Sequence, residues 1–471
     1  MNSMNKILST VILLGFILLC GCNTQPSPIR SGELWPDNNG EHINAHGGGV
    51  MYHDGTYYWF GENKCDTTSS AMVGVMCYSS QNLTDWKNEG VALAVEDNDS
   101  SDITRGCILE RPKVVYNAKT GKFVMWFHLE LKGKGYEAAR SGVAVSDTPT
   151  GPYRFIRSGR VNAGKLPFDM DEQAQATMDT LNALHYAKWW TPQWVDAVGK
   201  GLILKRDFEG GQMARDMTVY VDDDGKAYMF WGSSNVFPIR GIELDRNHRF
   251  LPKGEKKELF GLDLANHGWE RFGENHVSDS DLGGFIEGPW MTKHNGKYYL
   301  QYGSPGTEFN VYGDGVYVAD HPMGPYTYQK HNPVSYKPGG FMNGAGHGSS
   351  VLGPDSTYWH FASMSLSINV NWERRLCMFP MGFDNDGIMF CDTRFGDYPH
   401  YAPAVPGKKG EFRGWMLLSY KKPVTASSYV KEYTPAALTD EKTKSFWLAE
   451  ANNDNQWVMI DLQNEAEVCA I

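Results

Sequence analysis

Five similar segments of this chain each begin with a side chain that can donate or accept a proton. These residues are His46, Glu110, Asp216, Glu287 and His347. Burial or a neighbouring negative charge raises the pKa of a carboxyl group, so one of three crowded acids can stay protonated near neutral pH. Hydrolysis of a glycosidic bond needs two carboxyl groups in different environments, one of which protonates the leaving oxygen. If the fold gathers the five residues, they can supply that chemistry; a water-satisfied polar plug is the alternative.

Repeated β-strand patterns surround these five residues. Each copy has a short strand, a turn containing Asp-Gly, Thr-Gly, Asn-Gly or Pro-Asp, and an aromatic-rich strand, with further strands behind it. The first copy reads HGGGVMYHDGTYYWFGENK, and the fourth reads EGPWMTKHNGKYYLQYGS. The copies begin 60 to 106 residues apart, which leaves room for about four short strands each. The sequence therefore predicts an all-β, five-bladed β-propeller whose inner strands bring the five residues to one mouth.

The spacing of the copies also predicts the domain organisation. The longest interval predicts a helical insertion between blades 2 and 3, at roughly 156–212. We expect a lipoprotein signal peptide (1–21), a tether (22–39), the propeller (40–405), a linker (406–420) and a truncated β-sandwich module (421–471). The order PVTAS, ALTD and QWVMIDL in the last part resembles a discoidin-type (coagulation factor type C) module. About 50 residues are too few to bury two sheet faces, so we expect this part to pack on the propeller or to be poorly ordered.

The N-terminus has the pattern of an export signal. Lys6 precedes the apolar run 7–20, which is shorter than a membrane-spanning helix and ends in LCGC, a sequence that resembles a bacterial lipobox. Lipid on Cys22 would make the chain an exported bacterial lipoprotein, anchored to the cell envelope at the outer membrane or the periplasmic face. Cleavage of a plain secretory signal elsewhere is the alternative.

Composition narrows the partners that the chain can have. The formal net charge is −11, and the sequence contains no Lys/Arg run, so we expect no nucleic-acid partner. We expect a monomer. The six cysteines beyond the lipobox include no CxxC and no zinc spacing, which favours buried free thiols. A disulfide between Cys65 and Cys77 across one hairpin is the alternative.

Five sequence pieces, taken in order, resemble glycoside hydrolase family 43 over roughly 40–405. They are INAHGGGVMYHDGTYYWFGENK, LERPKVVYN, ARDMTVYVDDDGKAYMFW, FIEGPWMTKHNGKYYLQY and GAGHGSS. The resemblance implies a five-bladed propeller that hydrolyses O-glycosyl bonds, with Glu287 as the general acid and Asp216 as the residue that modulates its pKa. It implies no required cofactor, and a structural Ca²⁺ or a water cluster in the channel beside His347.

The chain departs from the family pattern at the general base. The usual Asp of the first inner strand is absent, because that strand reads AHGGG. Together with GENK and ERPK, this form resembles the branch that contains exo-β-1,3-galactanases and related arabinofuranosidases. In that branch the Glu of ERPK is a site residue, so Glu110 is a candidate for the base or for a ligand of a sugar hydroxyl. We expect His46 and Glu62 to bind substrate, and Trp126 and Trp290 to stack on a sugar or to belong to the core.

These expectations converge on one activity with two alternatives. The leading interpretation is an exo-acting, inverting hydrolase that releases terminal sugars from plant arabinogalactan-type polysaccharide. Inversion requires the acid and base carboxyls to lie roughly 6.5–9.5 Å apart. The first alternative is an α-L-arabinofuranosidase or related furanosidase. The second is a catalytically silent carbohydrate-binding propeller, an alternative that the missing Asp favours.

Overall fold

The computed structural model of the chain describes residues 28–468 with several gaps. The gaps are residues 33 and 355 and the segments 64–68, 162–212, 235–237, 246–251, 279–282, 366–373, 394–399, 402–412, 415–416 and 443–444. The predicted signal peptide and nearly all of the predicted helical insertion lie outside the described residues. No helix within the described ranges is long and apolar enough to cross a membrane.

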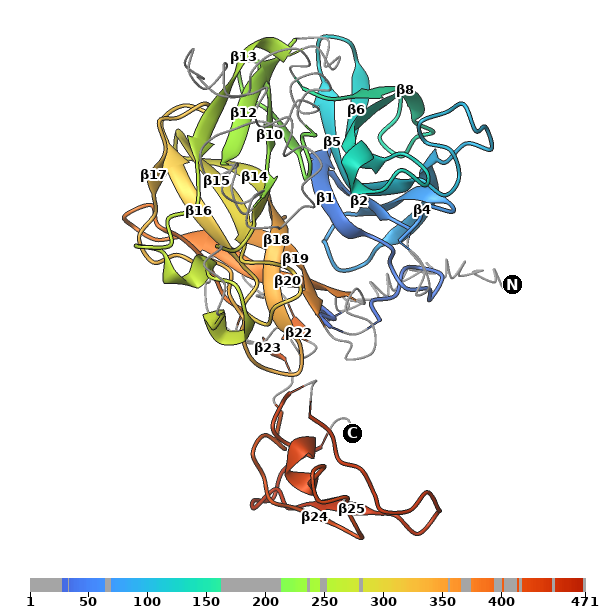
Figure 1. Cartoon of the computed structure of the whole chain (residues 1–471), viewed down its shortest axis with the longest axis vertical. Helices are drawn as coiled ribbons and strands as arrows, with labels where there is room; N and C mark the ends of the chain where they lie inside the picture. Colours follow the sequence, from blue (N-terminus) through green and yellow to red (C-terminus); the bar gives the residue numbers. More distant parts are fainter. Residues whose placement is uncertain are drawn as a thin grey trace, which may run out of the picture.

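Five antiparallel sheets form the body of the molecule (Figure 1). The first two sheets consist of β1 (His46–His53), β2 (Thr56–Glu62), β3 (Gly74–Ser80), β4 (Lys87–Ala94), β5 (Ile108–Asn117), β6 (Lys122–Glu130), β7 (Arg140–Ser146) and β8 (Arg154–Gly159). The third consists of β9 (Thr218–Val221), β10 (Ala227–Trp231), β12 (Ile239–Leu244) and β13 (Pro252–Phe260). The fourth consists of β14 (Ile286–His294), β15 (Lys297–Ser304), β16 (Gly313–Ala319) and β17 (Thr327–Tyr328), with β11 (Ser233–Ser234) added beside β14. The fifth consists of β18 (Asn343–Leu352), β19 (Tyr358–Ser365), β20 (Arg374–Phe383) and β21 (Met389–Cys391).

The inner strands of the five sheets close a ring. β1 contacts β5, β5 contacts β9, β9 contacts β14, β14 contacts β18, and β18 returns to β1. The predicted five-bladed propeller is therefore confirmed. The turns explain why the inner strands reverse sharply: Asp54-Gly55 and Asn295-Gly296 each have φ between 46° and 80° at both residues. This pair of positive angles is the conformation that joins adjacent antiparallel strands in two-residue hairpins.

Hydrophobic side chains fill the spaces between neighbouring blades. One cluster between the second and third blades contains Trp126, Met229 and Trp231. Another, between the third and fourth blades, contains Phe230, Leu300 and Tyr302. Aromatic strands therefore pack face to face across each seam, as expected for sheets stacked radially around a channel.

The N-terminal segment packs at the seam between blades 5 and 1. Ile29 and Trp35 are buried in one cluster with Trp59 of the first blade and Trp359 of the fifth. The Gly32 N–H donates to the Leu376 carbonyl at 3.1 Å. Part of the segment that we expected to be a tether (22–39) therefore packs on the propeller, at Ile29, Gly32 and Trp35. A short polar-looking segment can still be ordered when a large aromatic residue fills a gap that ring closure leaves.

The remaining elements lie outside the blades. They are the 3₁₀ turns η1 (Tyr136–Ala138), η3 (Gly268–Glu270), η4 (Glu274–His276) and η5 (Pro435–Leu438) and the strands β22 (His400–Tyr401), β23 (Arg413–Gly414), β24 (Val424–Ala426) and β25 (Val458–Ile460). β24 pairs with β25 in a small C-terminal unit, seen below the propeller in Figure 1. It touches the propeller through a bridge between Gly340 and Lys442. The discoidin-type resemblance of this unit stays a prediction.

The described cysteines follow the expectation from the sequence. Cys77, Cys107 and Cys377 are buried thiols, and Cys391 is a half-buried thiol. Cys65 lies outside the described residues, so the alternative disulfide between Cys65 and Cys77 stays a prediction.

Replacing Trp35 with alanine tests the role of the N-terminal segment. Trp35 is 1% exposed, with its ring edge-on to Trp59 at 5.7 Å. Its loss leaves a cavity, so we expect the free energy of unfolding to fall by about 3–5 kcal/mol in urea denaturation. The neighbouring Leu34 is 61% exposed, and Leu34→Ala should change stability by less than about 0.5 kcal/mol. Equal small effects would show that the segment only lies against the surface.

Candidate active site

Four of the five inner strands, those of blades 1, 2, 4 and 5, carry a β-bulge at the end where the predicted site residues lie. The pairing shifts between His46 and Gly49 in blade 1, between Glu110 and Lys113 in blade 2, and between Glu287 and Trp290 in blade 4. Two residues per strand are thus left out of the ladder, which bends the strand and redirects its side chains toward the channel mouth. In blade 5 the bulge follows Gly346.

We expected the five predicted residues to occupy equivalent positions of the inner strands, and the bulges show that they do not. His347 occupies the first bulged position, the equivalent of Gly47, Arg111 and Gly288, and not the position of Glu287. Asp216 comes before the first residue of β9 and, like Arg111 and His347, has a left-handed backbone, with φ between 49° and 56°. Three non-glycine residues in this sparsely populated region are costly, and such residues cluster at functional sites.

Glu287 has the environment of a general acid. Glu287 is buried, with 8% of its surface exposed. Oε1 accepts a hydrogen bond from the Tyr312 hydroxyl at 2.5 Å, and Oε2 accepts one from the Ser233 hydroxyl at 3.2 Å. Burial first, and then the negative charge of Asp216, raise the pKa of Glu287 to about 7. A carboxyl group that holds its proton at neutral pH can transfer it to a leaving oxygen.

Arg111 is the positive charge at the centre of the acidic residues. Its Nε lies 3.8 Å from Asp216 Oδ1. Burial disfavours its charge, but the carboxylates of Asp216 and Glu62 outweigh burial and raise the pKa of Arg111. The Arg111 side chain passes so close to β1 that position 47 has room only for a glycine. A Cβ on Gly47 would lie 2.7 Å from Glu62 Oε1 and 2.8 Å from the Arg111 side chain, and the glycine has φ +63°.

The structure places the predicted residues Glu62, His46 and Glu110 in different surroundings. Glu62 is 2% exposed, stands opposite His46 in the β1–β2 ladder, and acts on Arg111 through its charge. His46 Nδ1 lies 3.0 Å from the Ser363 hydroxyl. Glu110 is half-buried on β5 opposite His128, directly before Arg111. Its roles as base or sugar ligand stay predictions, as does substrate binding by His46 and Glu62.

The two predicted tryptophans differ. Trp126 is 0% exposed and lies in the core between blades 2 and 3, where its ring cannot meet a sugar, so its assignment to the substrate site is wrong. Trp290 is half-buried, and its indole N–H donates to the Ser350 carbonyl at 3.0 Å. It lines a channel cavity of about 350 Å³, further along the inner strands, together with Gly49 and Lys113. Stacking of Trp290 on a sugar stays a prediction.

Several groups at the site were not found by sequence reasoning. Tyr312, which directly precedes β16, and Ser233 of β11 bind the Glu287 carboxyl, and Arg111 directly follows the predicted residue Glu110. Tyr136 lies on η1, with the Arg215 guanidinium 4.2 Å from its ring centre. Burial, the largest cause, raises the pKa of Tyr136 to about 12 despite the Arg215 charge. The ERPK motif contains Arg111, and the third repeated segment, which ends in GSS, contains Ser233; Tyr312 and Tyr136 lie outside the repeated pattern.

The channel ion that the resemblance implied beside His347 stays a prediction. Among the residues that the structure describes, no group of three or more His, Cys, Asp or Glu side chains is arranged to hold a metal ion. The His347 ring instead packs on the backbone of blade 4, where a Cβ on Gly288 would lie 2.5 Å from it.

Comparison with known proteins is consistent with this geometry. The family model described as glycosyl hydrolases family 43 matches residues 172–389. A solved GH43 β-1,3-galactosidase, in complex with galactodeoxynojirimycin, is 38% identical, and the match covers 77% of this chain and 98% of that one, with a TM-score of 0.61. The chain belongs to glycoside hydrolase family 43.

Other family 43 proteins are more distant. The exo-β-1,3-galactanase of Phanerochaete chrysosporium, solved with β-1,3-galactotriose, shares the fold at 22% identity and a TM-score of 0.57, over 87% of this chain and 76% of that one. A xylosidase/arabinosidase of Bacteroides ovatus is 28% identical over 213 residues, which are 45% of this chain. That match spans 53% of the curated relative's length.

The electrostatics of Glu287 predict opposite shifts in the pH profiles of two variants. Activity that needs protonated Glu287 is present below its pKa and is lost as the pH rises through about 7. Asp216→Asn removes a charge that raises this pKa, so the alkaline limb of kcat/KM should move to lower pH by ~1 unit. Tyr312→Phe removes a hydrogen bond that lowers it, so the limb should move to higher pH. Shifts in the same direction, or none, would contradict the assignment.

Proposed function

We propose that this family 43 protein is an exo-acting, inverting glycoside hydrolase that releases terminal galactose from the β-1,3-linked galactan of arabinogalactan-type polysaccharide. The observation that carries the hydrolytic function is the buried Glu287 carboxyl, whose pKa is raised to about 7 beside Asp216. The galactose preference is supported by the 38% identical relative, a β-1,3-galactosidase solved with galactodeoxynojirimycin.

The mechanism follows from the side chains around Glu287. Glu287 protonates the glycosidic oxygen as the bond breaks, while the Tyr312 and Ser233 hydroxyls fix its two oxygens. Arg111 balances the negative charge that accumulates as the proton leaves, and Asp216 keeps Glu287 protonated before that step. A water molecule attacks the opposite face of the sugar, and Glu110 is our candidate for the group that accepts its proton.

Two alternatives make different predictions. Curated relatives include an arabinoxylan arabinofuranohydrolase of Paenibacillus polymyxa, 24% identical over 283 residues, which favours a furanosidase. The missing Asp in the first inner strand favours a silent carbohydrate-binding propeller. Against a silent propeller, a raised acid pKa confers nothing on binding alone, and burying a carboxyl group is costly.

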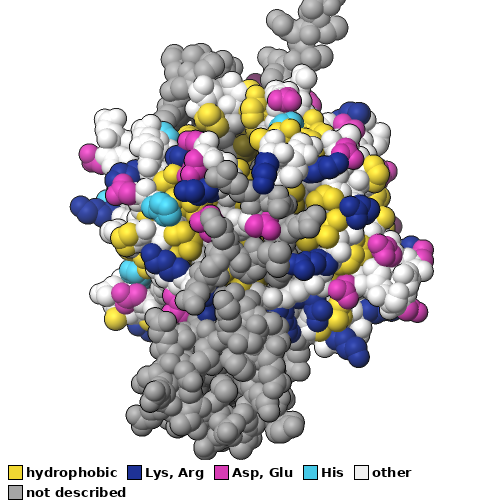
Figure 2. Space-filling view, turned by 90° about the horizontal axis from the view of Figure 1, so that it is seen from above, with side chains coloured by type: hydrophobic (Ala, Val, Ile, Leu, Met, Phe, Trp, Pro, Cys, Tyr) yellow, Lys and Arg dark blue, Asp and Glu magenta, His cyan; other side chains and the backbone are white. Residues whose placement is uncertain are grey.

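The expected lipobox bears on where in the cell the enzyme acts. We propose that lipid on Cys22 anchors the monomeric chain to the bacterial cell envelope, where it meets polysaccharide. The face in Figure 2 carries Lys/Arg and Asp/Glu side chains interspersed over its surface. This mixture suits a sugar substrate better than a nucleic acid, which needs a basic stripe.

A substrate panel with product stereochemistry tests this proposal. β-1,3-Galactan, arabinan, arabinoxylan and the matching aryl glycosides should be incubated with the full chain, and early products should be followed by proton NMR. We expect galactose from the galactan alone, appearing first as the α-anomer because inversion changes the β-linkage. Release of arabinose supports the furanosidase, and first appearance of β-galactose contradicts inversion. No release from any substrate supports the silent propeller.

Glu287→Gln tests the acid itself. The amide keeps the size of the side chain but has no proton to transfer, so kcat on galactan should fall by about 10²–10⁴-fold. The loss should be much smaller for an aryl galactoside whose leaving group needs no protonation. Glu258→Gln, an acid on β13 whose side chain is 43% exposed, serves as the control and should retain full activity. Near-normal turnover of galactan by Glu287→Gln would reject the assignment.

A further inference from the structure

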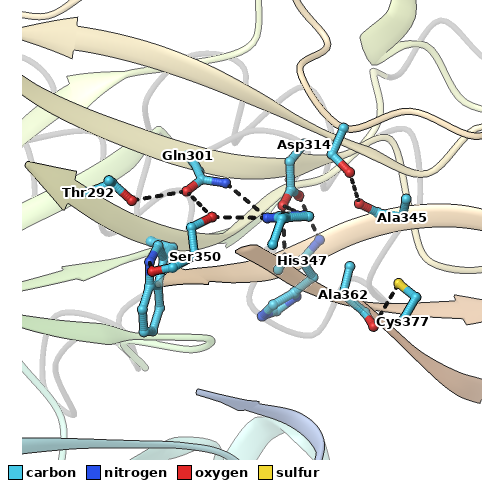
Figure 3. Close-up of polar contacts among 12 residues, drawn as sticks. Thr292, Gln301, Asp314, Ala345, His347, Ser350, Ala362 and Cys377 are labelled. Carbon is cyan, nitrogen blue, oxygen red and sulfur yellow. Dashed lines mark hydrogen bonds and ion pairs between the residues drawn. The ribbon is translucent and has the colours of Figure 1, made fainter. Parts of the chain in front are cut away.

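Asp314 binds the bulge of the fifth inner strand from the neighbouring blade (Figure 3). This residue of β16 is 1% exposed. Its Oδ1 accepts the His347 N–H at 2.6 Å, and its Oδ2 accepts the Gly348 N–H at 2.9 Å. These are the two residues that the β18–β19 ladder leaves out between Gly346 and Ser349. One carboxylate therefore satisfies both buried N–H groups, each of which would be expensive to leave unpaired.

A second layer of polar side chains supports the Asp314 carboxylate. His360 is fully buried, and its Nε2 lies 3.3 Å from Asp314 Oδ2. Its Nδ1 lies 3.0 Å from the Ser350 hydroxyl, which also lies 2.9 Å from Gln301 Oε1. The His360 ring thus lies between the Asp314 carboxylate and the Ser350 hydroxyl, and its contact with Asp314 is a close approach of charge and ring and not a hydrogen bond of good geometry.

The bulge that Asp314 holds forms one side of the acid's environment. His347 has φ +56°, a conformation that a non-glycine residue adopts only when its surroundings impose it. Its ring packs on Gly288, the residue after Glu287, so closely that a Cβ there would lie 2.5 Å away. Two residues before Asp314, Tyr312 donates its hydroxyl to Glu287. The segment 312–314 thus binds the acid with one side chain and its neighbouring bulge with another.

We propose that Asp314 is a positioning residue for Glu287. Through the two bulge N–H groups it fixes the His347 ring against Gly288, and the ring keeps water away from the acid. His360, Ser350 and Gln301 hold the Asp314 carboxylate in place. This inference rests on the proposed role of Glu287 as the general acid. The other titratable and charged groups that face Glu287 are Asp216, Arg111, Tyr136, Tyr312 and Glu308.

The first test needs no substrate. Asp314→Asn presents an amide N–H₂ to one of the two backbone N–H groups, so the bulge should shift and admit water to Glu287. The titration of Glu287 can be followed as the infrared band of its protonated carboxyl, isolated by subtracting the spectrum of the matching Glu287→Gln protein. We expect the midpoint in Asp314→Asn to fall by ~1 pH unit or more relative to the native chain. An unchanged midpoint overturns the proposal.

The second test separates positioning from general damage. On a glycoside that the native chain cleaves, kcat of Asp314→Asn should fall about 10–100-fold with a poor leaving group. It should fall far less with a dinitrophenyl leaving group, and KM should change little. Equal losses on both substrates mean that the variant is merely damaged, and they overturn the proposal. If the native chain cleaves no glycoside, the proposed function fails, while the infrared titration still decides the inference.

Two further variants keep the test decisive. Asp222→Asn is the matched control, because Asp222 binds Lys293 and Tyr298 at the opposite end of the inner strands. It should leave the Glu287 midpoint and the leaving-group selectivity unchanged. If Asp314→Asn does not fold, Ser350→Ala removes only the hydroxyl behind His360. We expect that variant to shift the midpoint in the same direction by a smaller amount; a native midpoint and native selectivity in Ser350→Ala would then overturn the proposal.

Discussion

Burial of one carboxyl group beside another is the constraint on which this site depends. Glu287 is nearly inaccessible to water and shares its surroundings with Asp216, so its ionised form is disfavoured twice. Without a compensating charge, two buried carboxyl groups would destabilise the fold. Arg111 supplies that charge from the adjacent blade, and the Tyr312 and Ser233 hydroxyls satisfy the oxygens of the acid. The propeller brings these groups together because its inner strands converge, and the bulges turn the side chains into the mouth.

The fold was predictable because its information is local and repeated. Asp-Gly and Asn-Gly turns between aromatic strands define each hairpin, and five copies define five blades. The packed N-terminal segment was missed because its stability comes from contacts between residues far apart in sequence. Trp35 and Trp359 meet only when the ring closes. In a segment rich in polar residues, Trp35 was the signal that could have indicated burial.

The site was predictable only in part, for reasons that lie in strand geometry. The repeats picked out Glu287 and Asp216, whose charges interact in the structure. An alignment of letters cannot show where a bulge adds a residue, so His347 was placed one position from its true equivalent. Trp126 and Trp290 both lie on blade strands, and successive side chains of a strand face opposite sides. Sequence pattern alone did not decide that Trp126 faces the seam and Trp290 the channel.

The most direct test of the account is the titration of Glu287 in the resting, unliganded protein. The carboxyl carbon can be observed by NMR in protein labelled with ¹³C at glutamate side chains, and the signal that disappears in Glu287→Gln identifies the residue. The account predicts a midpoint near 7. A midpoint near 4.5, the ordinary value for glutamate, would show that the carboxyl is ionised at neutral pH and has no proton to give to a glycosidic oxygen.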